Sequence, residues 1–236
     1  MFRKLFAALG VGIVTISAAV SIAWAAPPYT PYANQATDAI YNLLFCDDIS
    51  AFRPKGDSQP TSWQTTLFSE PADISALEAL AADTSREGRL RALAYQRLRS
   101  AGQKVPDKVL LGVIVEVPLS QGLDTLAAYS EGGVRYINKT GTVGVFESVP
   151  ALQGIVQDLF KASQRVVDHT GPAQGARLPP PKPGFIRITF LASDGLYVGE
   201  GPMSWMQRDP MATQIIHNAT ALLQQVVAIG VKSDRQ

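Results

Sequence analysis

The second half of the chain alternates short apolar runs with turn residues, which is the pattern of a β-sheet. Almost every residue from Val109 to Val117 is apolar, and most are β-branched, as in a strand covered on both faces. Shorter strands are predicted over 123–129, 134–138 and 143–147, separated by turns that contain glycine. These connections are too short for helical crossovers, so we expect the four strands to form an antiparallel meander.

A helix and a long connection are predicted after this meander. Pro150 suits the first turn of a helix, and apolar residues recur at helical spacing from Leu152 to Val166. Residues 168–184 then read as a connection, in which the proline-rich run 178–183 favours an extended chain. The helix should cover one face of the sheet.

The chain ends with a predicted hairpin and a last helix. Strands over 185–191 and 196–198 are joined by the turn Ser193-Asp194-Gly195. Asp209 is a suitable N-cap, with Pro210 at the first helical position. From residue 108 the predicted order is therefore β-β-β-β-α-β-β-α.

The first part of the mature chain reads as helical and irregular. Apolar residues recur at helical spacing over 36–44, and the Pro-, Ser- and Gly-rich stretch 53–71 is typical of a surface loop. Asp73 offers an N-cap to a helix that we expect Gly88 to interrupt. A second helix is predicted over 90–98, with an end near residue 102.

Together these elements predict an α+β fold with one antiparallel sheet of about six strands backed by helices, preceded by a helical N-terminal region. We divide the chain into 1–25, a signal peptide or membrane anchor, 26–107, the helical and irregular region, and 108–236, an α+β sandwich packed with it as one domain. The layout is loosely similar to sensor and adaptor modules of the profilin, roadblock and PAS kind, but its element order matches none of them fully. The likeness concerns architecture alone.

The N-terminus resembles an export signal. Arg3 and Lys4 precede an uncharged run from Leu5 to Trp24, which ends in Ala-Trp-Ala. These are the three parts of a secretory signal, and we expect cleavage between Ala25 and Ala26. A retained single-pass anchor is the alternative, because about 20 apolar residues can span a bilayer. Either reading exports the remainder, and we expect a periplasmic location.

Charge excludes one class of partner. The segment 1–25 holds two of the 21 basic side chains and none of the 20 acidic ones, so the mature chain is near neutral. A protein that grips a nucleic-acid backbone usually has a basic excess, and we therefore expect no nucleic-acid partner. The local basic concentration on the predicted 90–98 helix is spread around its circumference, which favours a solvated helix over a site for an acidic partner or anionic lipid.

Candidate chemistry is sparse. The lone Cys46 ends an apolar helical pattern and is best read as a buried small side chain, with an intermolecular disulfide or a reactive thiol as alternatives. The two histidines, His169 and His217, are far apart in sequence and lack metal-ligand spacing, and no nucleotide-binding motif occurs. No cofactor or metal is expected. A hydrolase would have to use Cys46 with Asp168 and His169.

Two surfaces are candidates for binding. The run 199–209 leaves a strand and enters a helix, and its Glu200, Trp205 and Arg208 could hold a carboxylate or a peptide, unless Trp205 folds back into the core. A second group of side chains crowds one hairpin of the meander, where aromatic and charged residues favour either a contact surface or cross-strand pairing. This second group comprises Tyr129, Glu131, Arg135 and Tyr136.

We therefore expect an exported, non-catalytic binding or protein-interaction module of the cell envelope, whose partner is an envelope protein or peptide. The alternatives are a small hydrolase using Cys46 or His169, and a membrane-tethered structural envelope protein. The sequence does not indicate an oligomeric state.

Overall fold

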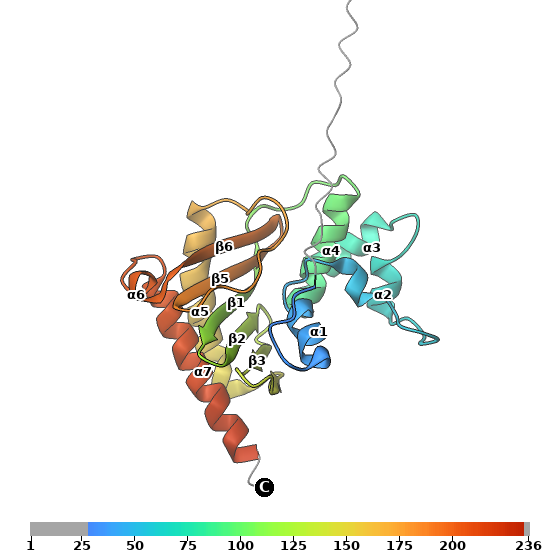
Figure 1. The fold of residues 1–236 in the computed structure, drawn as a ribbon. Helices are drawn as coiled ribbons and strands as arrows, with labels where there is room; N and C mark the ends of the chain where they lie inside the picture. The colour runs from blue at the N-terminus through green and yellow to red at the C-terminus, as the bar shows by residue number, and fades with distance from the viewer. Residues whose placement is uncertain (1–27, 234–236) are drawn as a thin grey trace, which may run out of the picture.

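The computed structural model describes residues 28–233, and the predicted signal or anchor segment lies outside them (Figure 1). The fold is α+β, with one antiparallel sheet of six strands in the order β4-β3-β2-β1-β5-β6. The strands are β1 (Leu110–Leu119), β2 (Gly122–Tyr129), β3 (Val134–Ile137), β4 (Val143–Phe146), β5 (Phe185–Ala192) and β6 (Gly195–Pro202). The predicted meander is β1 to β4, and the hairpin β5–β6 pairs with the other side of β1.

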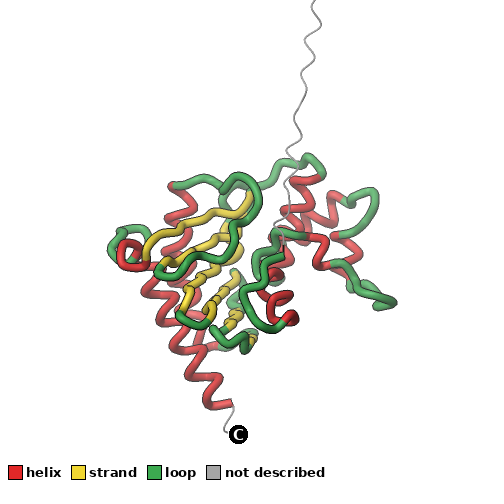
Figure 2. The backbone as a smooth tube through the Cα atoms, in the orientation of Figure 1, coloured by secondary structure: helices red, strands yellow, loops and turns green. Residues whose placement is uncertain are grey.

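The helices lie on both sides of this sheet (Figure 2). They are α1 (Gln35–Leu43), α2 (Ser62–Leu67), α3 (Ile74–Ala82), α4 (Gly88–Ser100), α5 (Pro150–His169), α6 (Met203–Met206) and α7 (Thr213–Ser233), with a 3-10 helix over Ile49–Phe52. Helices α5 and α7 pack against each other and cover one face (Figure 1). The helices before β1 cover the other face.

Each face of the sheet has its own apolar core, because side chains alternate along a strand. Val113 and Val115 of β1 face α5 and α7, where they meet residues such as Leu159. Ile114 points to the opposite face, into a core shared with buried side chains of α1 and α4, including Tyr41. The N-terminal region therefore supplies the cover for one face of the sheet.

Several predicted boundaries are corrected by the structure. The predicted loop 53–71 contains α2, which begins with a capping box between Thr61 and Gln64. Gly88 begins α4 instead of interrupting a helix, and α5 continues to His169. The expected N-cap Asp209 accepts hydrogen bonds from the backbone ahead of α7, at 2.9 and 3.0 Å.

The connection between α5 and β5, residues 170–184, is here called the strap. Its proline-rich part has no helix or strand, as the sequence predicts. Arg187 of β5 fixes it to the sheet, because its Nη1 donates to the carbonyl oxygens of Leu178 and Pro179 at 3.2 and 2.5 Å. The Tyr29 hydroxyl donates to the carbonyl oxygen of Arg177 at 2.7 Å. The strap is thus held between the sheet and the N-terminal region.

Candidate functional site

A cavity of about 620 Å³ lies between the strap, α4 and the β5–β6 hairpin. It is larger than the cavities of about 110 and 280 Å³ on the α5 and α7 side of the sheet. We call it the strap groove. Its lining comprises Phe45–Asp47, Ala92, Gln96, Arg99, the strap residues 172–178, and residues 191, 192, 194–196 and 198 of the hairpin.

The floor of the strap groove is apolar. It contains the fully buried side chains of Phe45 and Leu191, together with Leu196. Two further apolar side chains line the groove and reach solvent, Leu178 on the strap at 58% exposure and Val198 on the edge strand β6 at 39%. An apolar concave surface of this size is typical of a small-molecule or peptide site.

The wall contributed by α4 carries a half-buried arginine. Arg99 Nη1 donates to the backbone carbonyl of Ser193 in the hairpin turn. No carboxylate within residues 28–233 approaches its guanidinium to an ion-pair distance of 4.0 Å. Burial lowers the pKa of Arg99, and the nearby charge of Asp194 opposes that change. The groove therefore contains a positive charge that is only partly compensated.

Two acceptor oxygens are buried beside the groove, one on α4 and one in the hairpin turn. Gln96 donates through Nε2 to the carbonyl oxygen of Asp47 at 3.0 Å, while its Oε1 is buried without a hydrogen-bond partner. Asp194 accepts from the Tyr197 hydroxyl at 2.7 Å through Oδ2, and its Oδ1 is likewise buried and unbonded. Both residues line the groove, but these two oxygen atoms do not face solvent.

Arg177 anchors the strap side of the groove. Its Nε donates to Asp47 Oδ2 at 2.8 Å and its Nη2 to Asn42 Oδ1 at 2.9 Å. The guanidinium also lies 3.9 Å from the centre of the Phe45 ring. Such a combination of ion pair, hydrogen bond and cation–π contact fixes the strap wall relative to the floor.

A row of polar side chains crosses the sheet beneath the strap. Thr125, Glu116, Arg187 and Glu200 stand opposite one another on β2, β1, β5 and β6. Arg187 pairs with Glu200, with Nε to Oε2 at 2.7 Å, and lies 3.9 Å from Glu116 Oε2. Glu116 is fully buried, and this burial raises the pKa of its carboxyl group.

This row is not among the sites predicted from the sequence, although the sequence carries a signal for it. Glu116 is the one charged residue in the apolar run Val109–Val117, and Arg187 is the one charged residue in Phe185–Leu191. A lone charge in a strand covered on both faces needs a buried partner. One strand carries a lone negative charge and the other a lone positive charge, which favours placing the two strands side by side in the sheet.

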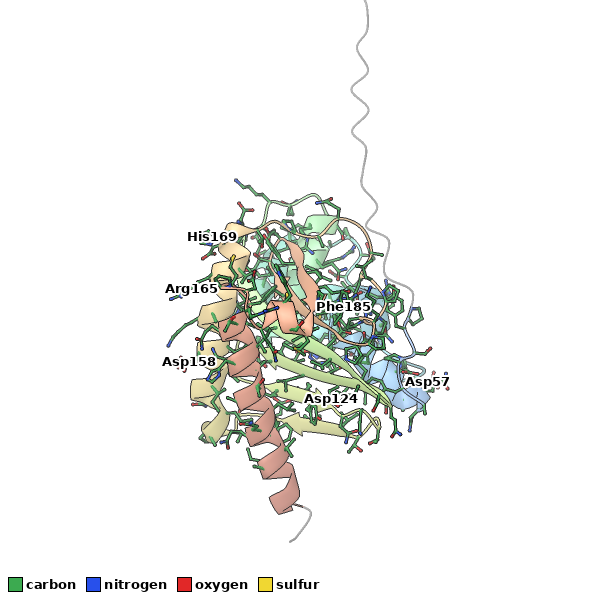
Figure 3. The ribbon with its side chains drawn as sticks, turned by 60° about the vertical axis from the view of Figure 1, so that its left-hand side comes forward. Asp57, Asp124, Asp158, Arg165, His169 and Phe185 are labelled. Carbon is green, nitrogen blue, oxygen red and sulfur yellow. The ribbon has the colours of Figure 1, made fainter. Side chains whose placement is uncertain are left out.

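The three residues of the hydrolase hypothesis are not brought together. Cys46 is buried in the lining of the strap groove, and burial raises the pKa of its thiol. Asp168 and His169 end α5 on the other side of the sheet, and Figure 3 shows His169 on that helix beside Arg165. His169 Nδ1 lies 2.7 Å from the carbonyl oxygen of Arg165.

In the meander hairpin, for which a contact surface and cross-strand pairing are both expected readings, Tyr129 and Glu131 lie against the N-terminal region. Tyr129 is fully buried, and its hydroxyl donates to the carbonyl oxygen of Leu44 at 3.0 Å. Glu131 Oε2 accepts from the backbone N–H of Gly88 at 2.7 Å, at the start of α4. Both side chains join the sheet to the N-terminal helices, and while Glu131 is half-buried, Tyr129 presents no exposed surface.

The other two residues of that hairpin point to opposite faces. Arg135 faces α4, where its Nη2 lies 3.2 Å from Glu87 Oε1 and also pairs with Glu147. Tyr136 faces α7, and its hydroxyl donates to Asp124 Oδ2 at 3.1 Å. Burial beside that carboxylate raises the pKa of Tyr136 to about 12. The alternation of a strand thus separates residues that are neighbours in sequence.

Among the candidate binding residues of the run 199–209, some are buried or paired within the fold and others are exposed on the surface. Met206 packs into the core, whereas Trp205 is 55% exposed on α6. Glu200 pairs with Arg187, and Arg208 is exposed and donates through Nε to a backbone carbonyl of the same segment. Trp205 is therefore the member of this group that offers a free apolar surface.

Comparison with protein-family models, characterised proteins and solved structures gives no match for this chain. Within residues 28–233 no group of three or more His, Cys, Asp or Glu side chains is arranged to hold a metal ion. The same range contains no helix long and apolar enough to cross a membrane.

Proposed function

We propose that this protein is an exported, non-catalytic binding module and that the strap groove is its ligand site. The observation that carries the proposal is one cavity in which an apolar floor adjoins a half-buried arginine without a carboxylate partner. Ligand sites combine these two features, because the apolar surface supplies affinity and a few polar groups fix the orientation. The resemblance of the N-terminus to an export signal supports a site outside the cytoplasm.

The chemistry of the lining favours binding over hydrolysis. Cys46 is the one thiol there, and its raised pKa keeps it protonated at neutral pH. The lining residues include no histidine that could take its proton. A hydrolase using His169 would need a separate site on α5, where the cavity beside that residue is smaller.

Filling the groove tests the proposal. Val198 lines the groove from the edge strand β6, so Val198→Trp should occupy it without disturbing the buried core. Val145→Trp is the matched control, because Val145 is an exposed valine, at 57%, on β4, the edge strand at the opposite end of the sheet. Each form would be recovered from its native envelope, and its bound small molecules or peptides would be identified by native mass spectrometry.

The proposal predicts a retained ligand in the wild-type protein and in Val145→Trp, and its loss in Val198→Trp. A wild-type protein that carries nothing, or a ligand retained equally by both variants, would contradict the assignment of the groove. A wild-type protein that carries no ligand is the result expected of the alternative, a membrane-tethered structural envelope protein.

A further inference from the structure

We infer that the ligand of the strap groove has an apolar body and a single carboxylate, and that Arg99 binds this carboxylate. The inference rests on the proposed function, since it assigns a ligand class to the same groove. It follows from the electrostatic state of Arg99 compared with the other arginines of the described chain.

Most arginines of the described chain have a carboxylate partner, which satisfies their charge. Those with such a partner within 4.0 Å are Arg86, Arg89, Arg97, Arg135, Arg177 and Arg187. Arg91 is buried without one, but it lies outside the groove lining and donates to the carbonyl oxygen of Ala81 at 2.9 Å. Arg99 is the arginine that combines partial burial, no ion pair and a position in the groove.

The guanidinium of Arg99 is available to a ligand. Its Nη1 donates a hydrogen bond to the Ser193 carbonyl oxygen, and its other two nitrogens make no hydrogen bond with the described residues. None of these nitrogens is sealed from solvent, in contrast to the free oxygens of Gln96 and Asp194. A guanidinium presents paired N–H groups that match a carboxylate, and such charge-assisted bonds offset the cost of partial burial.

The surrounding charges favour a single negative charge on the ligand. Asp194 lies near enough to Arg99 to influence its pKa, and Asp47 lines the same groove. A phosphate, which carries more charge, would meet more repulsion from these carboxylates than a carboxylate would. An amine would be attracted to them, but the unbonded oxygen of Asp194 is turned away from solvent and Asp47 is already paired with Arg177.

The apolar body is assigned by the accessible apolar side chains of the groove. Leu178, Leu196 and Val198 line it, reach solvent and offer no polar side-chain atom, so a chain or ring next to the carboxylate would replace water there. The same chemistry is presented by a small aryl or alkyl carboxylate and by the C-terminus of an apolar peptide. The two sources can be separated by their relative affinities.

Three probes with one apolar body and different charges test the carboxylate. Titration calorimetry of the wild-type mature protein would compare 4-phenylbutyrate, 4-phenylbutanamide and 4-phenylbutylamine. Loss of a charge-assisted pair predicts about 10-fold or greater preference for the carboxylate over the amide. The amine should bind no better than the amide.

Variants of Arg99 test the assignment of the residue. Arg99→Gln should bind acid and amide equally, whereas Arg99→Lys should retain part of the preference because it keeps the charge but loses the paired N–H geometry. Arg86→Gln is the control, because Arg86 is exposed and remote from the groove lining. If Arg99→Gln does not fold, the wild-type Arg99 Nε–H resonance provides the readout, and it should shift with the acid and not with the amide.

A final arm identifies the source of the carboxylate. N-acetyl-Leu-Phe with a free C-terminus should bind more tightly than 4-phenylbutyrate if the natural ligand is a peptide end, and less tightly if it is a small molecule. Either order supports the inference, provided that the C-terminal amide of the peptide binds more weakly.

Three results would overturn it. They are equal affinity for acid and amide in the wild-type protein, an acid preference that survives Arg99→Gln, and no binding of any probe. Each of these leaves the proposed function to be decided separately by the ligand retained in Val145→Trp and lost in Val198→Trp.

Discussion

The Tyr41 hydroxyl donates a hydrogen bond of 2.6 Å to Glu116 Oε1. This bond joins α1 to the central strand of the sheet across the buried face. The second carboxylate oxygen of Glu116 has no hydrogen-bond partner and lies 3.9 Å from Arg187. Because Arg187 also holds the strap, the buried carboxylate, the strap and the wall of the groove form one connected structure.

Glu116→Gln should alter how stability depends on pH. Burial raises the pKa of Glu116 above its ordinary value of 4.5, so the folded state holds this proton more tightly than the unfolded state. This tighter proton binding stabilises the folded state fully when the pH is below 4.5, and the stabilisation is lost as the pH rises through the raised pKa of the folded state. Glutamine stays neutral at every pH, so the variant should gain stability relative to the wild type as the pH rises. The gain should be about 1.4 kcal/mol for each pH unit by which the pKa in the folded protein exceeds the ordinary value.

Urea unfolding of both proteins from about pH 4 to about pH 8 measures this difference. Tyr41 can still donate to the glutamine oxygen, which keeps the comparison isosteric. A difference in unfolding free energy that does not change with pH would show that Glu116 is ionised in the folded protein at its ordinary pKa.

Arg177→Met should loosen the strap. The substitution removes the ion pair to Asp47 and the hydrogen bond to Asn42, and it leaves a largely buried carboxylate unpaired. Breaking a buried pair costs about 3–5 kcal/mol. Hydrogen exchange should therefore accelerate over residues 172–184 in the variant. The exposed pair of Arg86 with Asp83 provides the control, since Arg86→Gln should cost less than about 1 kcal/mol and leave the strap amides unchanged.

Two helical glycines should respond in opposite directions to alanine. A Cβ at Gly88 would overlap the carbonyl oxygen of Leu111, where α4 meets β1, so Gly88→Ala should destabilise the protein by about 1–3 kcal/mol. Gly154 in α5 has open space around it, and Gly154→Ala should stabilise by about 0.5–1 kcal/mol. Thermal unfolding compares the two. Equal effects would contradict the close approach of α4 to the sheet.

The elements with a strong local pattern could be predicted from the sequence. The meander, the final hairpin and the α+β class follow from apolar runs divided by turn residues, and they are confirmed. The cap at Asp209 follows from its position before the last apolar stripe. The short helices α2 and α6 were missed because each is only a turn or two long and lies in a stretch rich in loop-forming residues.

The candidate site could not be predicted, because it is assembled from four distant segments. Arg99 belongs to a helix with several arginines, and nothing in the sequence distinguishes it from Arg97, which pairs with Glu70. For Tyr129 both a contact surface and a structural role stay open in the sequence, because the sequence does not show which helix covers that face. Long-range packing, and not local pattern, decides which of these side chains is buried and which is left unpaired.

The N-terminal residue of the exported protein tests the signal. Mass spectrometry of the intact protein from its native envelope should show a chain that begins at Ala26, as the Ala-Trp-Ala sequence predicts. A chain that begins at Met1 or Phe2 would instead support the anchored form.

The most direct test of the central claim is the ligand carried by Val198→Trp compared with Val145→Trp. If the strap groove is the binding site, the wild-type protein and Val145→Trp retain the same ligand and Val198→Trp retains none. Equal retention by the two variants, or an empty wild-type protein, would contradict the claim.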